Sequence, residues 1–556
     1  MLTDNTHVQK IAILGDSATQ YINKFILKNS KNKKFEILDF DIDQIENQIY
    51  NSNSELYEYK PDFIIIFQST QKLQLEFSKL SNHSKQQFAS ENAGLINQLY
   101  HEIQSRVSCK VLWNNFYEIN DGIYGNYANN VTCSFLSQLR KLNVQISELA
   151  IKHGNLFIYD LSLLQTQIGA NTFLDNRMYV LAGMAISIAG MENMSNELLS
   201  IISAINGSIK KCLILDLDNT LWGGIIGDDG IENIQIGNLG VGKAFTQIQH
   251  WAKELKNRGI ILAICSKNNE KIALEPFKKH PDMVLKLTDI AIFVANWNNK
   301  VDNIRHIQEV LNVGFDSMVF IDDNLFERNM VRESISDICV PELPDDPSEY
   351  LPFLQSQNLF ETASISMADS DRTEQYQAES KRVEIKKSFK NEGEYLESLQ
   401  MKAIVEAANK FTIPRIAQLT QRSNQFNLRT QRYTNDNIES FMESGNHEVL
   451  TFSLADKFSD YGLVSVIILE KKEKQLFIDT WIMSCRVLKR GLEKFILNKL
   501  VTFAYQNNFT HILGEFIPTK KNLLVEHHYR ELGFKKSEGL WKLGIEEYSQ
   551  KKVFIT

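Results

Sequence analysis

Short apolar runs alternate with longer amphipathic stretches over the first third of the chain. Between residues 10 and 160 the apolar runs read KIAILGDS, FEILDF, DFIIIF, KVLWNN and LFIYD. Runs of this kind, rich in β-branched and aromatic residues, are typical of strands that are buried on both faces of a parallel sheet. The amphipathic stretches between them indicate helices. We therefore predict a doubly wound α/β domain in residues 1–205.

A second alternation of the same kind begins at Lys211. Its predicted strands are CLILDL, IILAICS, AIFVA and SMVFIDD. Between the first two, AFTQIQHWAKELKNRG has the apolar spacing of a helix and ends at Gly259, a residue that favours a helix stop. Its apolar face consists of Phe245, Ile248, Trp251, Ala252 and Leu255. The pattern predicts a second doubly wound α/β domain in residues 206–365.

The pattern changes after residue 365. Residues 366–400 are polar and rich in charge, with weak helical periodicity, and we interpret them as a connecting arm. From there the order becomes mixed, with strands at GLVSVIIL, QLFIDTWIMS and HILGEFIP and a helix at GLEKFILNKLVTFAYQ. This predicts an α+β domain in residues 401–556. Three domains are what a chain of 556 residues is expected to form.

Composition and charge limit the classes of function. Apolar residues make up 43% and charged residues 23% of the chain, as in ordinary soluble proteins. The net charge of −8 gives no general attraction to nucleic acid or to an anionic membrane. The run VLAGMAISIAG is too short to cross a bilayer, and MLTDNTHVQK is not a signal peptide. The cysteines lack metal-ligand spacing and are expected to be reduced thiols. We expect a cytoplasmic protein that binds neither nucleic acid nor membrane.

Polar residues follow the strands of the second domain at the point where each strand ends. Ligands of open α/β sheets bind outside the carboxyl ends of the strands. Carboxylates, a hydroxyl and an ammonium group at that edge can hold Mg²⁺ and a phosphoryl group. Each acid could instead cap a helix, but four such motifs in order favour a site. The residues concerned are Asp216, Asp218, Ser266, Lys300, Asp322 and Asp323.

This set resembles the haloacid dehalogenase (HAD) superfamily, whose first motif is Asp-x-Asp-x-Thr and here reads DLDNT at residues 216–220. The resemblance implies that Asp216 attacks phosphorus and that Asp218 acts as general acid and base. Thr220 would orient the loop, Ser266 would bind the phosphate and Lys300 would offset its charge. The implied Mg²⁺ ligands are Asp216, the backbone carbonyl of Asp218, Asp322 and, in support, Asp323.

The wider sequence resembles the FkbH family, a HAD branch of natural-product assembly. The motifs that carry the resemblance are LDLDNTLWGGIIGDDG, ICSKN, NWNNK, FIDDN, RIAQLTQRSNQFNLRTQRYT, DKFSDYGLVSV and MSCRVLKRGLE, and it extends over nearly the whole chain. It implies an enzyme that takes the glyceryl unit of 1,3-bisphosphoglycerate, removes phosphate, and passes a glyceryl thioester to the phosphopantetheine of an acyl carrier protein. The alternatives are a phosphatase that acts on another small phosphoester without acyl transfer, and a non-catalytic scaffold that binds carrier proteins.

Formation of a thioester requires a thiol, and two cysteines are candidates. Cys265 directly precedes Ser266, but alternation along the strand would point its side chain away from whatever Ser266 faces. Cys485 lies in the third domain, in MSCRVL. For each of them, a buried, unreactive cysteine is the better interpretation.

The first domain resembles the SGNH-type esterases and lipases. ILGDSATQ places Ser17 in a turn after the first strand. The Asp-x-x-His that such enzymes need is absent, because FLDNRMYV places Met178 three residues after Asp175. His153 is expected to lie on the surface or to serve packing. We therefore predict a degenerate SGNH-like domain without esterase activity, which docks a partner or orients the central domain.

The third domain resembles the GNAT acyltransferase fold, in which a glycine-rich turn before a helix holds the pyrophosphate of coenzyme A. Here that turn carries Lys489 where the motif has its middle glycine. The residues expected to contact a pantetheine or coenzyme A phosphate are Arg486, Lys489, Arg490 and Gly491; the alternative is a solvated helix start. The segment QRSNQFNLRTQRYT could form either an amide-rich pocket wall or a solvated face.

Overall fold

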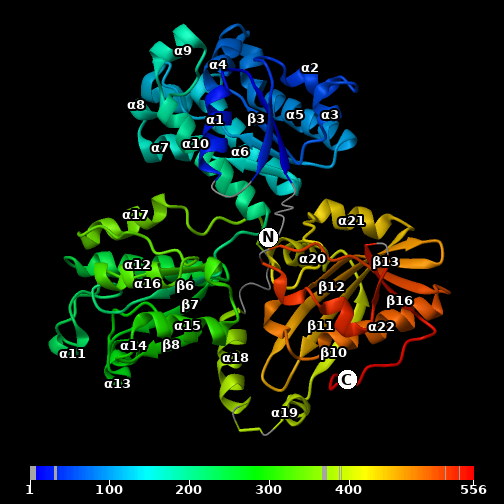
Figure 1. Ribbon diagram of the computed structural model, residues 1–556. Coiled ribbons are helices and arrows are strands. Elements are labelled where there is room, and N and C mark those ends of the chain that lie inside the picture. The colour runs from blue at the N-terminus through cyan, green and yellow to red at the C-terminus, as the bar shows by residue number, and fades with distance from the viewer. Residues whose placement is uncertain are drawn as a thin grey trace. The chain divides into compact units, whose positions relative to one another are not determined.

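The computed structural model describes residues 8–30, 34–365, 372–386, 388–389, 391–519, 521–537 and 539–556. The chain divides into two compact units, Met1–Ser203 and Ala204–Thr556. The expected fold class is confirmed, because two parallel sheets flanked by helices are followed by a mainly antiparallel sheet in an α+β arrangement (Figure 1). None of the helices in the described ranges is long and apolar enough to cross a membrane.

The N-terminal unit is built on a five-stranded parallel sheet with the order β2-β1-β3-β4-β5. All five predicted apolar runs form its strands, which are β1 (Gln9–Gly15), β2 (Phe35–Asp39), β3 (Phe63–Phe67), β4 (Lys110–Asn114) and β5 (Leu156–Tyr159). The strand order reverses between β1 and β3, where ligands of such sheets commonly bind.

Helices cover both faces of this sheet. Alternate strand residues such as Ala12, Ile64 and Val111 pack in one core cluster with side chains of α2 to α6. The helices are α1 (Gln20–Asn29), α2 (Ile45–Tyr50), α3 (Glu55–Tyr59), α4 (Thr70–Ser78), α5 (Asn82–Arg106), α6 (Phe135–Lys152), α7 (Leu161–Ile168), α8 (Ala170–Phe173), α9 (Asn176–Ala182) and α10 (Ile188–Ile205).

The second unit begins with a four-stranded parallel sheet in the order β8-β7-β6-β9. Leu215 of β6 pairs with Ile264 of β7 and with Ile321 of β9, so the carboxyl ends of the central strands lie at one edge. The predicted helix is α12, and Gly259 beyond its end has the positive φ of +94° that glycine tolerates best. The strands are β6 (Cys212–Leu215), β7 (Ile261–Ser266), β8 (Ile292–Ala295) and β9 (Met318–Ile321). The helices are α11 (Ile226–Asp229), α12 (Gly242–Asn257), α13 (Glu270–Ala273), α14 (Glu275–Lys279), α15 (Lys300–Leu311), α16 (Leu325–Ser334) and α17 (Tyr350–Ser356).

The segment interpreted as a connecting arm contains two helices, α18 (Arg372–Lys386) and α19 (Glu392–Ser398). Tyr376 of α18 is buried in the core cluster of the parallel sheet. Arg382, from the same helix, forms an ion pair with Asp456 of the third domain. The segment is therefore packed against both domains of the second unit. Residues 366–371, 387 and 390 lie outside the described residues.

The C-terminal domain contains a seven-stranded sheet with the order β10-β11-β12-β13-β14-β16-β15. Its neighbouring strands are antiparallel except for β13 and β14. The strands are β10 (Lys402–Ala407), β11 (His447–Ala455), β12 (Asp460–Lys472), β13 (Gln475–Met483), β14 (His511–Gly514), β15 (Lys535–Ser537) and β16 (Leu540–Gly544). The helices are α20 (Ile413–Arg422), α21 (Asn435–Glu443), α22 (Leu492–Gln506) and α23 (His528–Leu532).

Candidate active site

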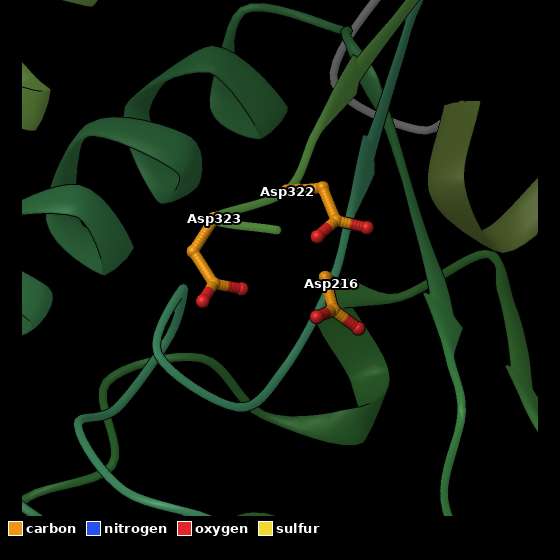
Figure 2. A group of neighbouring side chains, drawn as sticks. All are labelled: Asp216, Asp322 and Asp323. Carbon is orange, nitrogen blue, oxygen red and sulfur yellow. The ribbon is translucent and has the colours of Figure 1, made fainter. Parts of the chain in front are cut away.

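Three carboxylates lie together at the carboxyl edge of the parallel sheet of the second unit. Each of Asp216, Asp322 and Asp323 offers an oxygen atom, and these atoms lie within 4.8 Å of one another. Figure 2 shows the three side chains turned toward a common point. Asp216 follows β6 and the other two follow β9, and the Asp216 N–H donates to the carbonyl of Ile321 at 3.0 Å. The pairing of these two strands therefore brings together acids that are about a hundred residues apart.

Lys300, the first residue of α15, places its ammonium group between two of these acids. Its Nζ lies 2.6 Å from Asp322 Oδ2 and 3.0 Å from Asp216 Oδ1, and the side chain is only 3% exposed. Burial alone would lower the pKa of Lys300, but the charges of the two acids raise it above its ordinary value. The ammonium group is therefore a permanent positive charge within the cluster.

One ammonium group does not balance three carboxylates. Burial, followed by the charge of Asp216, raises the pKa of Asp322 to about 7 and that of Asp323 to about 6. The part of these shifts that comes from Asp216 reflects the excess of negative charge in the cluster. A bound cation would relieve that excess.

The turn after β6 is held by its own side chains. Asn219 adopts a positive φ of +53°, and its side-chain oxygen accepts the N–H of Gly224 at 2.9 Å. Thr220 is fully buried, and its hydroxyl accepts the N–H of Asp323 at 3.3 Å. Thr220 thus connects the turn after β6 to the turn after β9, which carries Asp322 and Asp323.

Asp218 is positioned outside the three-carboxylate cluster. Its Oδ1 accepts from the indole N–H of Trp222 at 2.9 Å and from the N–H of Ile226 at 3.0 Å, and its Oδ2 accepts from Asn268 at 3.0 Å. Burial raises the pKa of Asp218, and the bonds from Ile226 and Trp222 oppose that rise. Three donors thus fix the orientation of this carboxyl group.

Ser266 is the last residue of β7 and is buried at the same edge of the sheet. The structure places each member of the predicted set (Asp216, Asp218, Thr220, Ser266, Lys300, Asp322 and Asp323) at this edge.

Sequence reasoning missed three residues that hold this arrangement. Trp222 and Asn268 orient Asp218, and both stand inside motifs that were already quoted. Arg328 of α16 donates to the backbone carbonyls of Asp322 at 2.9 Å and Asp323 at 2.6 Å. Nothing in the local pattern marked Arg328, because its role depends on how α16 folds back over the turn that precedes it.

The two candidate thiols lie in different surroundings. Cys265 is fully buried, its Sγ lies 3.8 Å from the carbonyl oxygen of Lys300, and burial raises the pKa of the thiol. A buried, protonated thiol is a poor nucleophile, which argues against an acyl-carrying role for Cys265. Cys485 is half-buried, and its Sγ lies 3.8 Å from the hydroxyl of Tyr376.

The expected phosphate contacts of the C-terminal domain are only partly exposed to a ligand. Arg490 is buried, pairs with Asp456 at 3.0 Å and lies over the ring of Tyr461. Arg486 is also buried, and its Nε donates to the hydroxyl of Ser484. These contacts correct the expectation for both arginines, whose guanidinium groups are used inside the domain.

Lys489 and Gly491 remain at the surface of this turn. Both have a positive φ, of +62° and +77°. Lys489 thus adopts the left-handed conformation that glycine would adopt more easily at this place. Its exposed ammonium group is the part of the predicted phosphate site that a ligand can still reach.

The arginine- and amide-rich segment QRSNQFNLRTQRYT, residues 421–434, lies where two neighbouring strands of the sheet separate. Parallel pairing of β13 and β14 stops after Ile478 and Gly514. Beyond that point the N–H of Leu428 donates to the carbonyl of Trp481, and the carbonyl of Leu428 accepts the N–H of Ile517 at 2.9 Å. The segment therefore lies between the two diverging chains.

Arg429 closes the same gap by electrostatic contacts. It pairs with Asp479 at 2.5 Å and with Glu515 at 2.7 Å, the residues that directly follow the last paired positions. Arg432 donates to the backbone carbonyls of Thr420 and Ser423. These side chains hold the domain together, so the idea of an amide-rich pocket wall is not supported.

The first unit lacks the contacts of a serine hydrolase. Ser17 is 4% exposed, and no histidine of the described chain hydrogen-bonds to it. His153 Nε2 instead bonds to Asn97 at 2.8 Å, and Asp175 caps α9 by accepting the N–H of Met178. The hydroxyl of Ser17 therefore has no histidine positioned as its base.

Comparisons with known proteins agree with this geometry. The family model of the FkbH N-terminal domain matches residues 10–203. A solved structure of the N-terminal part of the protein BF1531 from Bacteroides fragilis, which contains a phosphatase domain and is complexed with Mg, is 48% identical. The match covers 64% of this chain and 94% of that chain, with a TM-score of 0.62. No curated protein matches the chain.

Matches to acetyltransferases are far weaker. The ribosomal-protein-S18-alanine N-acetyltransferase of Escherichia coli is 13% identical, with 27% of this chain and 98% of that chain covered and a TM-score of 0.21. Mutant forms of a spermidine/spermine N-acetyltransferase of Vibrio cholerae are 12% identical, with 26% and 96% covered and a TM-score of 0.22.

Proposed function

This chain belongs to the FkbH family, and on that basis we propose that its central domain is a Mg²⁺-dependent phosphatase of the HAD type. The observation that carries the proposal is the contact of Lys300 with Asp216 and Asp322 beside Asp323 at the edge of the parallel sheet. The 48% identical relative, described as containing a phosphatase domain complexed with Mg, supports the same activity and the same ion.

The residues of the site fit a magnesium ion. The donor atoms are carboxylate oxygens, which Mg²⁺ prefers. Three carboxylates and the single ammonium of Lys300 leave two negative charges, which match a divalent cation. Asp216 and Asp322 would hold the ion with Asp323 in support, and the carbonyl of Asp218 is added by family resemblance. When bound, the ion offsets the charge of the phosphoryl oxygens.

The residues of the chain account for both halves of phosphate ester hydrolysis. A carboxylate oxygen of Asp216 attacks phosphorus, the bond between phosphorus and the ester oxygen breaks, and Asp218 gives that oxygen its proton. Asp218 then takes a proton from water, which attacks the aspartyl-phosphate and regenerates Asp216. Lys300 and Ser266 bind the phosphoryl oxygens throughout.

The specific reaction that we propose begins with an acyl phosphate, 1,3-bisphosphoglycerate. A thiolate attacks the carbonyl carbon, the carbon–oxygen bond breaks, and phosphate leaves with the electron pair. The aspartate site then hydrolyses the phosphate ester at the other end, which leaves a glyceryl thioester. The resemblance of the motifs to the FkbH family supports this reaction. The thiol that finally carries the glyceryl group is the phosphopantetheine of an acyl carrier protein.

Exposed apolar side chains close in sequence to the site support a macromolecular acceptor. Trp297, three residues before Lys300, is 75% exposed, and Leu325 and Phe326, directly after the second acidic turn, are 57% and 65% exposed. Large apolar side chains that remain exposed commonly mark interaction surfaces. A carrier protein that delivers its thiol to the site would cover them.

Removal of the metal is expected to inactivate the enzyme reversibly. Without a divalent cation the cluster keeps its excess negative charge, which repels a phosphate dianion. Phosphate release should fall to background with excess EDTA and return when Mg²⁺ exceeds the chelator. Unchanged turnover in EDTA would contradict the metal site.

Intact-mass spectrometry of a carrier protein tests the specific reaction. We expect a glyceryl adduct on the pantetheine after incubation with the enzyme, Mg²⁺ and 1,3-bisphosphoglycerate. Phosphate release without an adduct would favour the plain phosphatase, and carrier binding without either product would favour the scaffold. Cys485→Ala should abolish loading only if the acyl group passes through that thiol; Cys133→Ala, a half-buried cysteine of the other unit, is the matched control.

A further inference from the structure

The N-terminal unit contains a cavity of its own at the carboxyl edge of its sheet. The cavity has a volume of about 470 Å³, within the range of small-molecule sites. It lies at the ends of β1 and β3, where the strand order reverses, and α2, α4 and α5 enclose it. Open parallel sheets bind ligands at this place. The lining residues of chemical interest are Asp16, Asp43, Glu46, Ser69, Lys72 and Glu76.

The inner part of the cavity combines one carboxylate with an apolar wall. Leu73, Leu99 and Phe116 line it and are buried. Asp16 accepts the N–H of Ser69 at 2.8 and 2.9 Å and the Ser69 hydroxyl at 3.3 Å. Ser69 thus supplies two donors, and the Ser17 hydroxyl supplies a third. A carboxylate offers about four acceptor positions, so Asp16 keeps capacity for one further donor. Burial raises the pKa of Asp16 to about 6, against the effect of Ser69 and Lys72.

The lining as a whole is acidic. Asp16, Asp43, Glu46 and Glu76 contribute four carboxylates against the single ammonium of Lys72, a balance of −3. Lys72 pairs with Asp43 at 2.5 Å, so its positive charge offsets that of Asp43 and not those of the other acids. Such a lining repels phosphates and carboxylates and attracts cations.

We propose that this cavity binds an organic ammonium ion with a short aliphatic chain. The ammonium group donates to Asp16, and the methylene groups contact Leu73, Leu99 and Phe116. A bare metal ion fits less well, because in the described chain the acids close enough to share a metal are Asp216, Asp322 and Asp323. The ligand does not depend on the hydroxyl of Ser17, which does not line the cavity. The proposed amine site shares no residue with the carboxylate cluster of the second unit.

Isothermal titration calorimetry of the full chain tests this with two probes of equal length. 5-Amino-1-pentanol should bind saturably, whereas 1,5-pentanediol, which lacks the charge, should not. Asp16→Asn should weaken binding of the amine by about tenfold or more, because an ion pair becomes a neutral contact. Glu148→Gln, which changes an exposed acid on α6, should leave it unchanged.

A second variant keeps the test decisive if Asp16→Asn does not fold. Glu46 and Glu76 are exposed at the mouth of the cavity, so Glu46→Gln/Glu76→Gln should fold normally and weaken the amine severalfold, more so at low ionic strength. Equal binding of the two probes, no binding of the amine, or amine binding unaffected by these substitutions would overturn the proposal.

Discussion

Asp216→Asn is expected to abolish phosphate release while the protein stays folded. The amide cannot attack phosphorus, so loss of this nucleophile should lower turnover by roughly four to six orders of magnitude. The fold should tolerate the change, because the amide has nearly the same shape and removes one of three crowded negative charges. Lys300 keeps its 2.6 Å contact with Asp322. Turnover of a small phosphoester and the thermal unfolding midpoint should be measured on the same preparation.

Asp302→Asn is the matched control. Asp302 lies two residues beyond Lys300 on α15, but its side chain is 61% exposed and points away from the carboxylate cluster toward Arg305 and Asn299. This variant should keep wild-type turnover. If Asp216→Asn retained a tenth of the wild-type rate, the assignment of the nucleophile would be wrong.

Asp456→Ala is expected to destabilise the second unit strongly. The Asp456 side chain is fully buried and lies 3.0 Å from both Arg382 of α18 and Arg490 before α22. It also accepts the hydroxyl of Tyr461 at 3.2 Å. Removal of one member of a buried ionic network leaves uncompensated charge, which costs about 3–5 kcal/mol of unfolding free energy. In urea, the unfolding of the second unit should have a clearly lower midpoint than in the wild type.

Glu439→Ala supplies the comparison for that measurement. Glu439 is an exposed acid on α21 of the same domain, so its loss should change the midpoint very little. A similar, small effect for both variants would mean that the two arginines do not depend on Asp456.

The strands and the edge that carries the site could be predicted from the sequence. Apolar runs with polar residues at their ends depend on burial along a single strand, and a strand of a parallel sheet is buried whichever neighbours it has. Asp216, Ser266, Lys300 and Asp322 were therefore found from local patterns. The conformation of the turn after β6 also follows locally, because Asn tolerates the positive φ found at Asn219.

Tertiary structure decided which partners these residues meet. Asn268 reaches Asp218 across fifty residues, and Arg382 reaches Asp456 across seventy-four. Arg490 looked like an exposed phosphate ligand, yet it is buried against Asp456. The sequence determines which side chains are charged. The partners that each side chain meets depend on strand order and helix packing. Those are long-range properties, because each contact closes a long loop, and the entropy of that closure must be offset by the rest of the fold.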